Sequence, residues 1–249
     1  MQSPVMLITG ASRGIGAALA RLAAARGYAV AINYLSNQAA AQAVADDITA
    51  AGGQALLVQG DVAQEADILR MFAAVDAAWG RLDVLVNNAG ILEQMMSVVD
   101  MSAERITRVM NTNVVGLMLC CREAIKRMAK SQGGSGGAIV NISSVAAKLG
   151  SPFEYVDYAA SKGAVDSITL GLAKEMALEG VRVNGVRPGL IYTDLHASGG
   201  EPGRVDRLAV NVPMQRGGQP EEIAEAVLWL ASDAASYVTG TWLDVSGGR

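Results

Sequence analysis

The chain has 249 residues, of which 51% are hydrophobic, and its 20 basic and 24 acidic residues leave a formal net charge of −4. A chain of this length forms one or two domains, and an α/β fold of this size is often one unit. Because no basic excess is available to neutralise phosphates, the charge balance argues against a general nucleic-acid or anionic-membrane binder.

Short β-branched runs alternate with longer helical patterns along the whole chain. Alternation of this kind implies crossover connections and a parallel sheet, and strands that are apolar almost throughout indicate helices on both faces. We therefore predict an α/β fold, with one doubly wound domain over residues 1–249 and about seven strands. The strands are expected at Val5–Thr9, Ala29–Asn33, Ala55–Gln59, Val84–Asn87, Ala138–Ile142, Val181–Val186 and Thr241–Val245, and the helices near Gly14, Gln38, Gln64, Ala103, Asp157 and Glu221.

A glycine-rich turn follows the first predicted strand and precedes an alanine-rich helix. Glycines allow close approach of a dinucleotide pyrophosphate, and a helix N-terminus supplies N–H donors and a favourable dipole. The spacing is G-x-x-x-G-x-G rather than G-x-G-x-x-G, and a tight structural turn is the alternative; the position between strand and helix favours a Rossmann-type phosphate site. The residues expected in this site are Gly10, Ser12, Arg13, Gly14, Ile15 and Gly16.

The end of the second predicted strand bears on which nicotinamide dinucleotide is bound. An acidic residue there would hold a ribose 2′-hydroxyl and repel a 2′-phosphate. The strand instead continues through Asn33, Tyr34 and Ser36 without an acid, and Arg13 adds a cation that can face a 2′-phosphate. The sequence therefore predicts a preference for NADP, with NAD possible, although a solvent-exposed arginine is the alternative for Arg13.

Tyr158 and Lys162 are four residues apart at the start of a predicted helix, so they lie on one face. A free tyrosine titrates near ~10, and a nearby ammonium and a nicotinamide cation both favour its phenolate. The strand Ala138–Ile142 delivers Ser143 and Ser144 at its carboxyl end, where a hydroxyl can polarise a substrate carbonyl. The pattern indicates hydride transfer between a nicotinamide and a carbonyl or alcohol carbon, with Tyr158 as acid and base.

The stretch from Arg187 to Pro220 breaks the alternation and is rich in glycine, proline and mixed charge. Long connections in compact domains are usually binding loops or covers, so we expect a substrate lid at about residues 190–219. It contains His196, the only histidine, which without further ligands reads as an ordinary lid residue; we predict no metal. Its arginines Arg204, Arg207 and Arg216 are compatible with a polar or anionic substrate.

Taken together, these motifs resemble the short-chain dehydrogenase/reductase family over essentially the whole chain, with the carrier-protein reductase and glucose dehydrogenase groups the most similar. The combination is specific, although no single motif is. It consists of Thr9-Gly10 with Gly14-Ile15-Gly16, Asp61-Val62, Asn87-Asn88-Ala89-Gly90, Asn113, Ser144, Tyr158 with Lys162, and Pro188-Gly189 with Ile191-Tyr192-Thr193.

The resemblance implies a role for each matched residue. Ser144 positions the substrate, Tyr158 exchanges the proton, and Lys162 binds the ribose and tunes Tyr158, while Asn113 holds a water that completes a proton relay. Asp61 and Val62 line the adenine site; Asn88, Ala89 and Gly90 pass beneath the cofactor; Pro188, Gly189, Leu190, Ile191 and Thr193 lie at its nicotinamide end. Ser144 and Tyr158 stand one residue further apart than in many relatives, which predicts an altered substrate pocket around Ser151–Tyr155, and Ser143 replaces Ser144 if the alignment slips by one.

The family usually assembles as a tetramer through long helices, so the resemblance implies a homotetramer. The helix near Ala103–Lys130 and the one from Asp157 are the predicted interfaces, although ordinary core is the alternative for their apolar residues. Carrier-protein reductases present basic residues to an acidic partner, and the loop Ser131–Gly137 has none; Lys126, Arg127, Lys130 and Lys174 remain nearby. The expected substrate is a small carbonyl or alcohol.

Two hypotheses therefore stand, an NADPH-dependent reductase and a catalytically silent protein of the same fold that senses NADP. The set of Asn113, Ser144, Tyr158 and Lys162 favours the enzyme, because a sensor has no need of it. Met1 to Pro4 lead into a strand without a basic leader, and no apolar run is long enough to span a bilayer. Adjacent Cys120 and Cys121 are expected to be buried free thiols, which fits a cytoplasmic protein.

Overall fold

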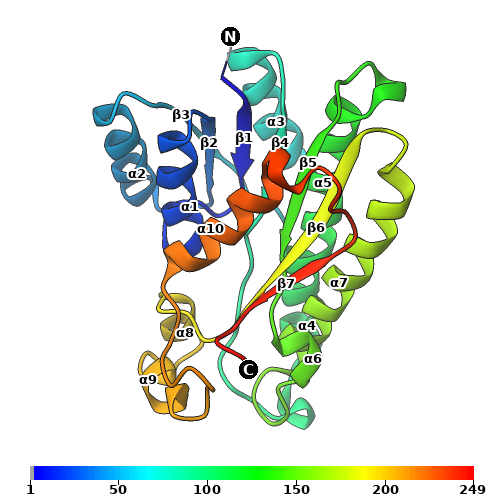
Figure 1. Cartoon of the computed structure of the whole chain (residues 1–249). Helices are drawn as coiled ribbons and strands as arrows, with labels where there is room; N and C mark the ends of the chain where they lie inside the picture. Colours follow the sequence, from blue (N-terminus) through cyan, green and yellow to red (C-terminus); the bar gives the residue numbers. More distant parts are fainter. Residues whose placement is uncertain (1–2) are drawn as a thin grey trace.

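The computed structural model describes residues 3–249, apart from the side chain of His196. Its seven strands form one parallel sheet in the order β3-β2-β1-β4-β5-β6-β7 (Figure 1). The order reverses between β1 and β4, which are neighbours in the sheet, so the predicted doubly wound α/β fold is confirmed. The strands are β1 (Val5–Ile8), β2 (Ala29–Tyr34), β3 (Gln54–Gln59), β4 (Val84–Asn87), β5 (Gly137–Ile142), β6 (Val181–Pro188) and β7 (Trp242–Val245).

Helices cover both faces of the sheet, and this explains why the strands are apolar throughout (Figure 1). Side chains alternate along a strand, so Met6 and Ile8 enter one core while Val5 and Leu7 enter the other. The first core is covered by α1 (Gly14–Ala25), α2 (Gln38–Ala50) and α10 (Pro220–Ala231), and the second by α3 (Glu65–Trp79), α5 (Gly116–Met128) and α7 (Val156–Met176). Cys120 and Cys121 are buried free thiols in the second core, as predicted.

The helix expected over Ala103–Lys130 is divided into three parts. It begins as α4 (Ala103–Met110), widens into the π-helical turn η2 (Asn111–Val115) and continues as α5. Single π turns inside α-helices occur frequently at functional sites, and this one contains Asn113. No glycine or proline marks the turn except Gly116 after it, so nothing in the residue pattern predicts a break.

The connections between the main elements contain short helices that the hydrophobic pattern did not reveal. Strand β6 continues to Pro188, two residues beyond its predicted end, and the segment after it folds into two of these helices. The short helices are η1 (Val98–Asp100), η3 (Lys130–Gln132), α6 (Ala146–Leu149), α8 (Leu195–Ser198), α9 (Arg204–Ala209) and η4 (Asp233–Ala235). In the described residues, no helix combines the length and apolarity that crossing a membrane requires.

Candidate active site

A cavity of about 630 Å³ lies at the carboxyl ends of the central strands, where open α/β sheets bind ligands. It runs from the turn between β1 and α1 to the segments that flank Tyr158. Of the residues predicted from the sequence, its wall contains Gly10, Ser12, Arg13, Gly14, Ile15, Asn33, Tyr34, Asp61, Val62, Asn88, Ala89, Gly90, Ser144, Tyr158, Lys162, Pro188, Gly189, Leu190, Ile191 and Thr193. Gly16, Ser36 and Asn113 lie outside the wall.

The glycine turn after β1 depends on conformations and spacings that only glycine permits. Gly10 and Gly14 have φ values of +63° and +53°, and a Cβ on Gly10 would lie 2.9 Å from the Cα of Ala89. A Cβ on Gly16 would lie 2.6 Å from the Asn88 amide nitrogen, so this glycine allows α1 to pack against the end of β4. Helix α1 begins without a side-chain cap, which leaves N–H donors at its N-terminus for an anion. These features fit a dinucleotide pyrophosphate.

Three neutral side chains hold this turn in place. The Asn88 amide donates to the backbone oxygens of Thr9 (2.8 Å) and Gly10 (2.9 Å). The Thr9 hydroxyl oxygen accepts from the backbone N–H groups of Asn88 and Ala89, both at 3.0 Å. Asn33 accepts from the Gly10 N–H at 3.0 Å. The turn is therefore fixed to β4 and β2 before any ligand binds.

The side chain of Asn33 bonds groups of the chain itself, whereas its position at the end of β2 suggested a contact with the cofactor. Its side chain is buried, and its amide nitrogen donates to the backbone oxygens of Val58 (3.1 Å) and Gly60 (3.0 Å). Since its oxygen holds Gly10, the whole amide is used within the chain. The next residue, Tyr34, is also buried and lines the cavity, whereas Ser36 is exposed beyond it. No acidic residue lies at this end of β2 in the described chain.

Tyr158 and Lys162 lie one turn apart on α7 and both face the cavity. The Lys162 ammonium nitrogen is 5.5 Å from the centre of the Tyr158 ring and donates to the backbone oxygen of Ile142 at 2.8 Å. Ser143 and Ser144 directly follow β5 and also line the cavity. The Ser143 hydroxyl donates to the backbone oxygen of Lys162 at 3.2 Å, while Ser144 forms a hydrogen bond with Tyr158. Ser144 is therefore the serine that faces the phenol.

The chain's own groups do not lower the pKa of Tyr158, contrary to the expectation from its neighbouring lysine. Burial raises the pKa of Tyr158 to about 12, and the hydrogen bond with Ser144 opposes this only in part. Burial also lowers the pKa of Lys162 to about 8, while the charge of Asp166 acts in the opposite direction. Desolvation thus outweighs the Ser144 hydrogen bond, and this pKa favours the neutral phenol of Tyr158 at neutral pH.

Asn113 sits behind the cavity wall and connects two segments that flank it. Its oxygen accepts from the Ile91 N–H at 2.8 Å, and its nitrogen donates to the Ile91 oxygen (3.1 Å) and the Ser161 hydroxyl (3.0 Å). The Ser161 hydroxyl donates in turn to the backbone oxygen of Tyr158 at 2.7 Å. The Asn113 side chain is therefore occupied by protein groups, and its expected part in a water relay stays a prediction.

The substrate end of the cavity brings together two segments that the sequence analysis considered separately. Tyr155 and Arg204 line the cavity, and the Arg204 guanidinium lies 5.1 Å from the centre of the Tyr155 ring. Arg204 is buried and forms ion pairs with Glu201 (2.9 Å) and Glu154. Segment 151–155, where an altered pocket was expected, thus joins segment 190–219, and its Ser151 lines the cavity with a φ of +45°. The sequence indicated both segments, but not the ion pair between Glu154 and Arg204, whose positions are 50 residues apart.

No group of three or more histidine, cysteine or acidic side chains suited to a metal occurs in the described part of the chain. The side chain of His196 lies outside the described residues.

Comparisons with known proteins place the chain in a family. A family model described as enoyl-(acyl carrier protein) reductase matches residues 10–249. The chain is 60% identical to the uncharacterized oxidoreductase YgfF of Escherichia coli (strain K12), over 98% of the chain and 99% of that protein. It is 40% identical to a 3-oxoacyl-[acyl-carrier-protein] reductase of Synechocystis sp., over 100% of the chain and 97% of that protein.

A solved structure gives the same result. The short-chain dehydrogenase/reductase from Serratia marcescens superimposes with a TM-score of 0.91 and 32% identity, covering 99% of this chain and 98% of that one. The chain belongs to the short-chain dehydrogenase/reductase family. It is accordingly an oxidoreductase that acts on a CH–OH or C=O group, and members of the family use nicotinamide cofactors.

Proposed function

We propose that the chain reduces a small carbonyl compound with NADPH, or oxidises the alcohol in reverse, with Tyr158 as the general acid and base. The observation that carries the proposal is one continuous cavity. Its wall contains the glycine turn at one end and Ser144, Tyr158 and Lys162 at the other. A dinucleotide held by its pyrophosphate at the turn would have room in this cavity to reach these three side chains.

The bound nicotinamide would supply the hydride, and the chain's own residues would bind the carbonyl and move the proton. The Ser144 hydroxyl orients the carbonyl oxygen next to Tyr158. Tyr158 donates its proton to that oxygen, because burial keeps the phenol protonated at neutral pH. The Lys162 ammonium, 5.5 Å from the centre of the Tyr158 ring, stabilises the phenolate that remains. Its charge matters most below pH ~8, where the lysine stays protonated.

Two observations support a preference for NADP over NAD. No carboxylate stands at the end of β2 where it would repel a 2′-phosphate. Arg13 is exposed at the cavity wall and forms no ion pair within the described residues, so its guanidinium can bind a phosphate. Because the Asn33 amide is fully used within the chain, we assign it to holding Gly10 rather than to contacting the ribose.

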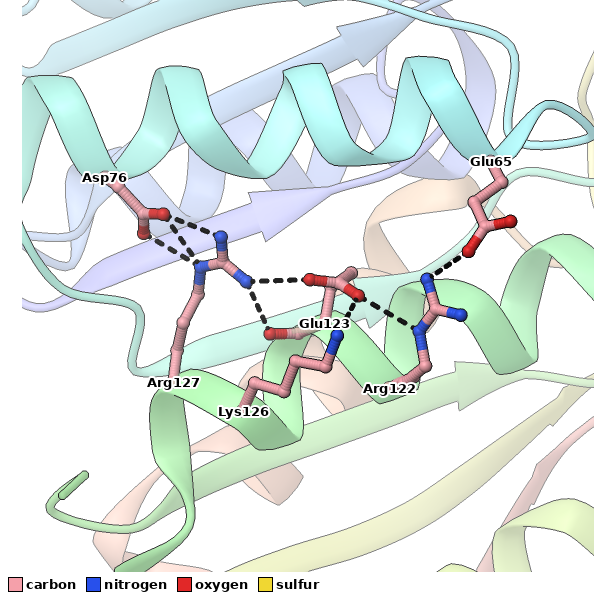
Figure 2. Close-up of polar contacts among 6 residues, drawn as sticks. All are labelled: Glu65, Asp76, Arg122, Glu123, Lys126 and Arg127. Carbon is pink, nitrogen blue, oxygen red and sulfur yellow. Dashed lines mark hydrogen bonds and ion pairs between the residues drawn. The ribbon is translucent and has the colours of Figure 1, made fainter. Parts of the chain in front are cut away.

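A free small molecule is the proposed substrate, in preference to a substrate held on a carrier protein. Two of the cations near the neutral loop Ser131–Gly137, Lys126 and Arg127, are engaged within the chain (Figure 2). Lys126 (2.8 Å) and Arg127 both bind the buried Glu123, and Arg127 also binds Asp76 at 2.6 Å. An acidic partner would have to compete with these carboxylates.

We further propose a homotetramer assembled through α4, α5 and α7 in the cytoplasm. Val115 and Met118, at the π turn and on α5, have exposed fractions of 46% and 51%, and Leu170 on α7 has 39%. Apolar side chains gathered on neighbouring helices favour contact with another subunit. Buried cysteines with raised pKa values suit a reducing compartment, and light scattering would measure the oligomeric state.

The test is NADPH oxidation by the wild type and by Tyr158→Phe over a panel of aldehydes, ketones and keto acids. Phenylalanine keeps the ring and removes the proton, so we expect kcat to fall about 100- to 10,000-fold while NADPH binding, followed by its fluorescence, stays close to wild type. Turnover that is equal in the two proteins would contradict the role of Tyr158. Tight NADPH binding without turnover of any carbonyl by the wild type would favour the sensor.

A further inference from the structure

A buried ion pair lies directly behind the residue proposed as the acid. The Arg105 Nε donates to one carboxylate oxygen of Asp157 at 2.8 Å, and a second guanidinium nitrogen donates to the other oxygen at 3.3 Å. The side chains are only 6% and 2% exposed, which makes this the most completely buried ion pair among the described residues. Asp157 immediately precedes Tyr158 in the sequence.

The pair joins three segments that form the substrate end of the cavity. Asp157 lies in the first turn of α7, and its carboxylate accepts from the Tyr158 N–H at 2.9 Å. Arg105 belongs to α4 and also donates to the backbone oxygen of Gln94 at 2.6 Å. Gln94 lies in the loop after β4, of which Ile91 and Leu92 line the cavity. One guanidinium therefore fixes the start of the catalytic helix and the loop opposite it.

A second connection runs parallel to the first from the same side of α4. Arg105, Val109 and Asn113 are spaced four residues apart, and all three are buried. Asn113 reaches Tyr158 through the Ser161 hydroxyl, which donates to the Tyr158 backbone oxygen at 2.7 Å. Thus the backbone N–H of Tyr158 is held by Asp157 and its backbone oxygen by Ser161, and both holding groups are fixed by this face of α4 and η2.

A buried ion pair is an unusual way to stabilise a helix contact. Removing two charges from water costs several kcal/mol per ion, and apolar residues of similar size often stabilise as well or better. What the pair adds is direction, because a planar guanidinium and a carboxylate bind in a fixed geometry. Because the pair lies next to Tyr158, its fixed geometry affects how the phenol is oriented for proton transfer.

We propose that Arg105 and Asp157 are positioning residues that set the orientation of the Tyr158 phenol and the distance between α7 and the loop at Gln94. This inference rests on the proposed function, since it concerns the same proton transfer. Neither residue lines the cavity, so both act through Tyr158 and Gln94 rather than by touching the substrate.

The experiment compares Asp157→Asn, Arg105→Met and Arg105→Lys with the wild type, using a carbonyl that the wild type reduces with NADPH. We expect kcat to fall about 10- to 100-fold in Asp157→Asn and Arg105→Met, as a small displacement of a catalytic group does, with a rise in KM for the carbonyl in Arg105→Met. Arg105→Lys keeps a cation and should recover part of kcat. The dissociation constant of NADPH should stay close to wild type, because the glycine turn is not touched.

The matched control is Asp76→Asn, which neutralises a carboxylate paired with Arg127 away from the cavity and should leave kcat unchanged.

The solvent deuterium isotope effect on kcat separates positioning from stability. It is a ratio, so a smaller fraction of folded enzyme leaves it unchanged, whereas a misplaced Tyr158 makes proton transfer slower and raises it. A wild-type isotope effect in Asp157→Asn, whether kcat falls or not, would overturn the inference while leaving the proposed function intact. A wild type that reduces no carbonyl would overturn the proposed function, and the inference with it.

Discussion

At the glycine turn the structure is held by neutral groups, while around Tyr158 it is held by charged ones. Asn88, Thr9 and Asn33 fix the turn through amide and hydroxyl bonds to backbone atoms. Arg105 and Arg204 fix the opposite end through carboxylates on other segments. Both sets of bonds link elements distant in sequence, but only the second depends on charge.

The difference follows from what each end has to bind. Pyrophosphate is bound by backbone N–H groups, so the turn needs a fixed backbone and no competing carboxylate. The substrate end consists of loops and short helices, which have fewer backbone bonds of their own to hold them. Guanidinium–carboxylate pairs supply direction between such segments. Cofactor binding and substrate binding should therefore respond to different substitutions.

Among the substitutions that compare the two ends, Asn88→Ala at the neutral end is expected to have the largest effect. It removes both bonds to the backbone oxygens of Thr9 and Gly10, and leaves two partly buried acceptors without this partner, at a cost of about 1–3 kcal/mol. The dissociation constant of NADPH, measured by fluorescence titration, should rise about 30-fold with little change in KM for the carbonyl at saturating NADPH.

Asn184→Ala is the matched control. Asn184 is buried and likewise bonds backbone groups, at Val238 (2.9 Å) and Thr241 (3.2 Å), but it lies outside the cavity wall. It should lower the melting temperature without weakening NADPH binding. Equal effects of the two variants on the dissociation constant would mean that the turn is not held specifically by Asn88.

A smaller effect, on substrate binding rather than on cofactor binding, is expected from Arg204→Met at the charged end. The substitution breaks the pairs with Glu154 and Glu201, so segments 151–155 and 190–219 lose the ion pair that joins them beside the cavity. KM for the carbonyl should rise about tenfold, since a poorly fixed wall binds and orients substrate less well, while NADPH binding stays unchanged. Arg207→Met, on the same helix but exposed and outside the cavity wall, should leave both constants unchanged. An Arg204 variant with a raised NADPH dissociation constant and a normal KM for the carbonyl would contradict the assignment of Arg204 to the substrate end.

The sequence indicated the features that are local along the chain, at both ends of the cavity, but not the contacts between distant segments, for a physical reason. Glycines with positive φ, an uncapped helix start and a Tyr–Lys pair on one helical turn are local features, so spacing alone indicates them. The Arg105–Asp157 and Arg204–Glu154 pairs join residues 52 and 50 positions apart, and each partner taken alone resembles an ordinary surface charge. The π turn at Asn113 was likewise invisible, because it depends on how α4 packs against α7 rather than on a helix-breaking residue. The direction in which the pKa of Tyr158 shifts could not be foreseen from Lys162, because it depends on how deeply the phenol is buried.

The smallest effect is expected where charge is introduced into the neutral end by Tyr34→Asp. Asn33 is unsuitable for this test, since its amide nitrogen donates to two backbone oxygens that a carboxylate would repel. Tyr34 lines the cavity, and a carboxylate there adds repulsion of about 1 kcal/mol toward a solvated 2′-phosphate, so the ratio of NADPH to NADH affinity should fall about fivefold. Because Tyr34 is buried, its removal also weakens packing, and Tyr34→Asn serves as the control that loses the ring without gaining the charge. If both variants shift the affinity ratio equally, the ring rather than the absence of a carboxylate determines the preference; if neither shifts it, Arg13 becomes the residue to change.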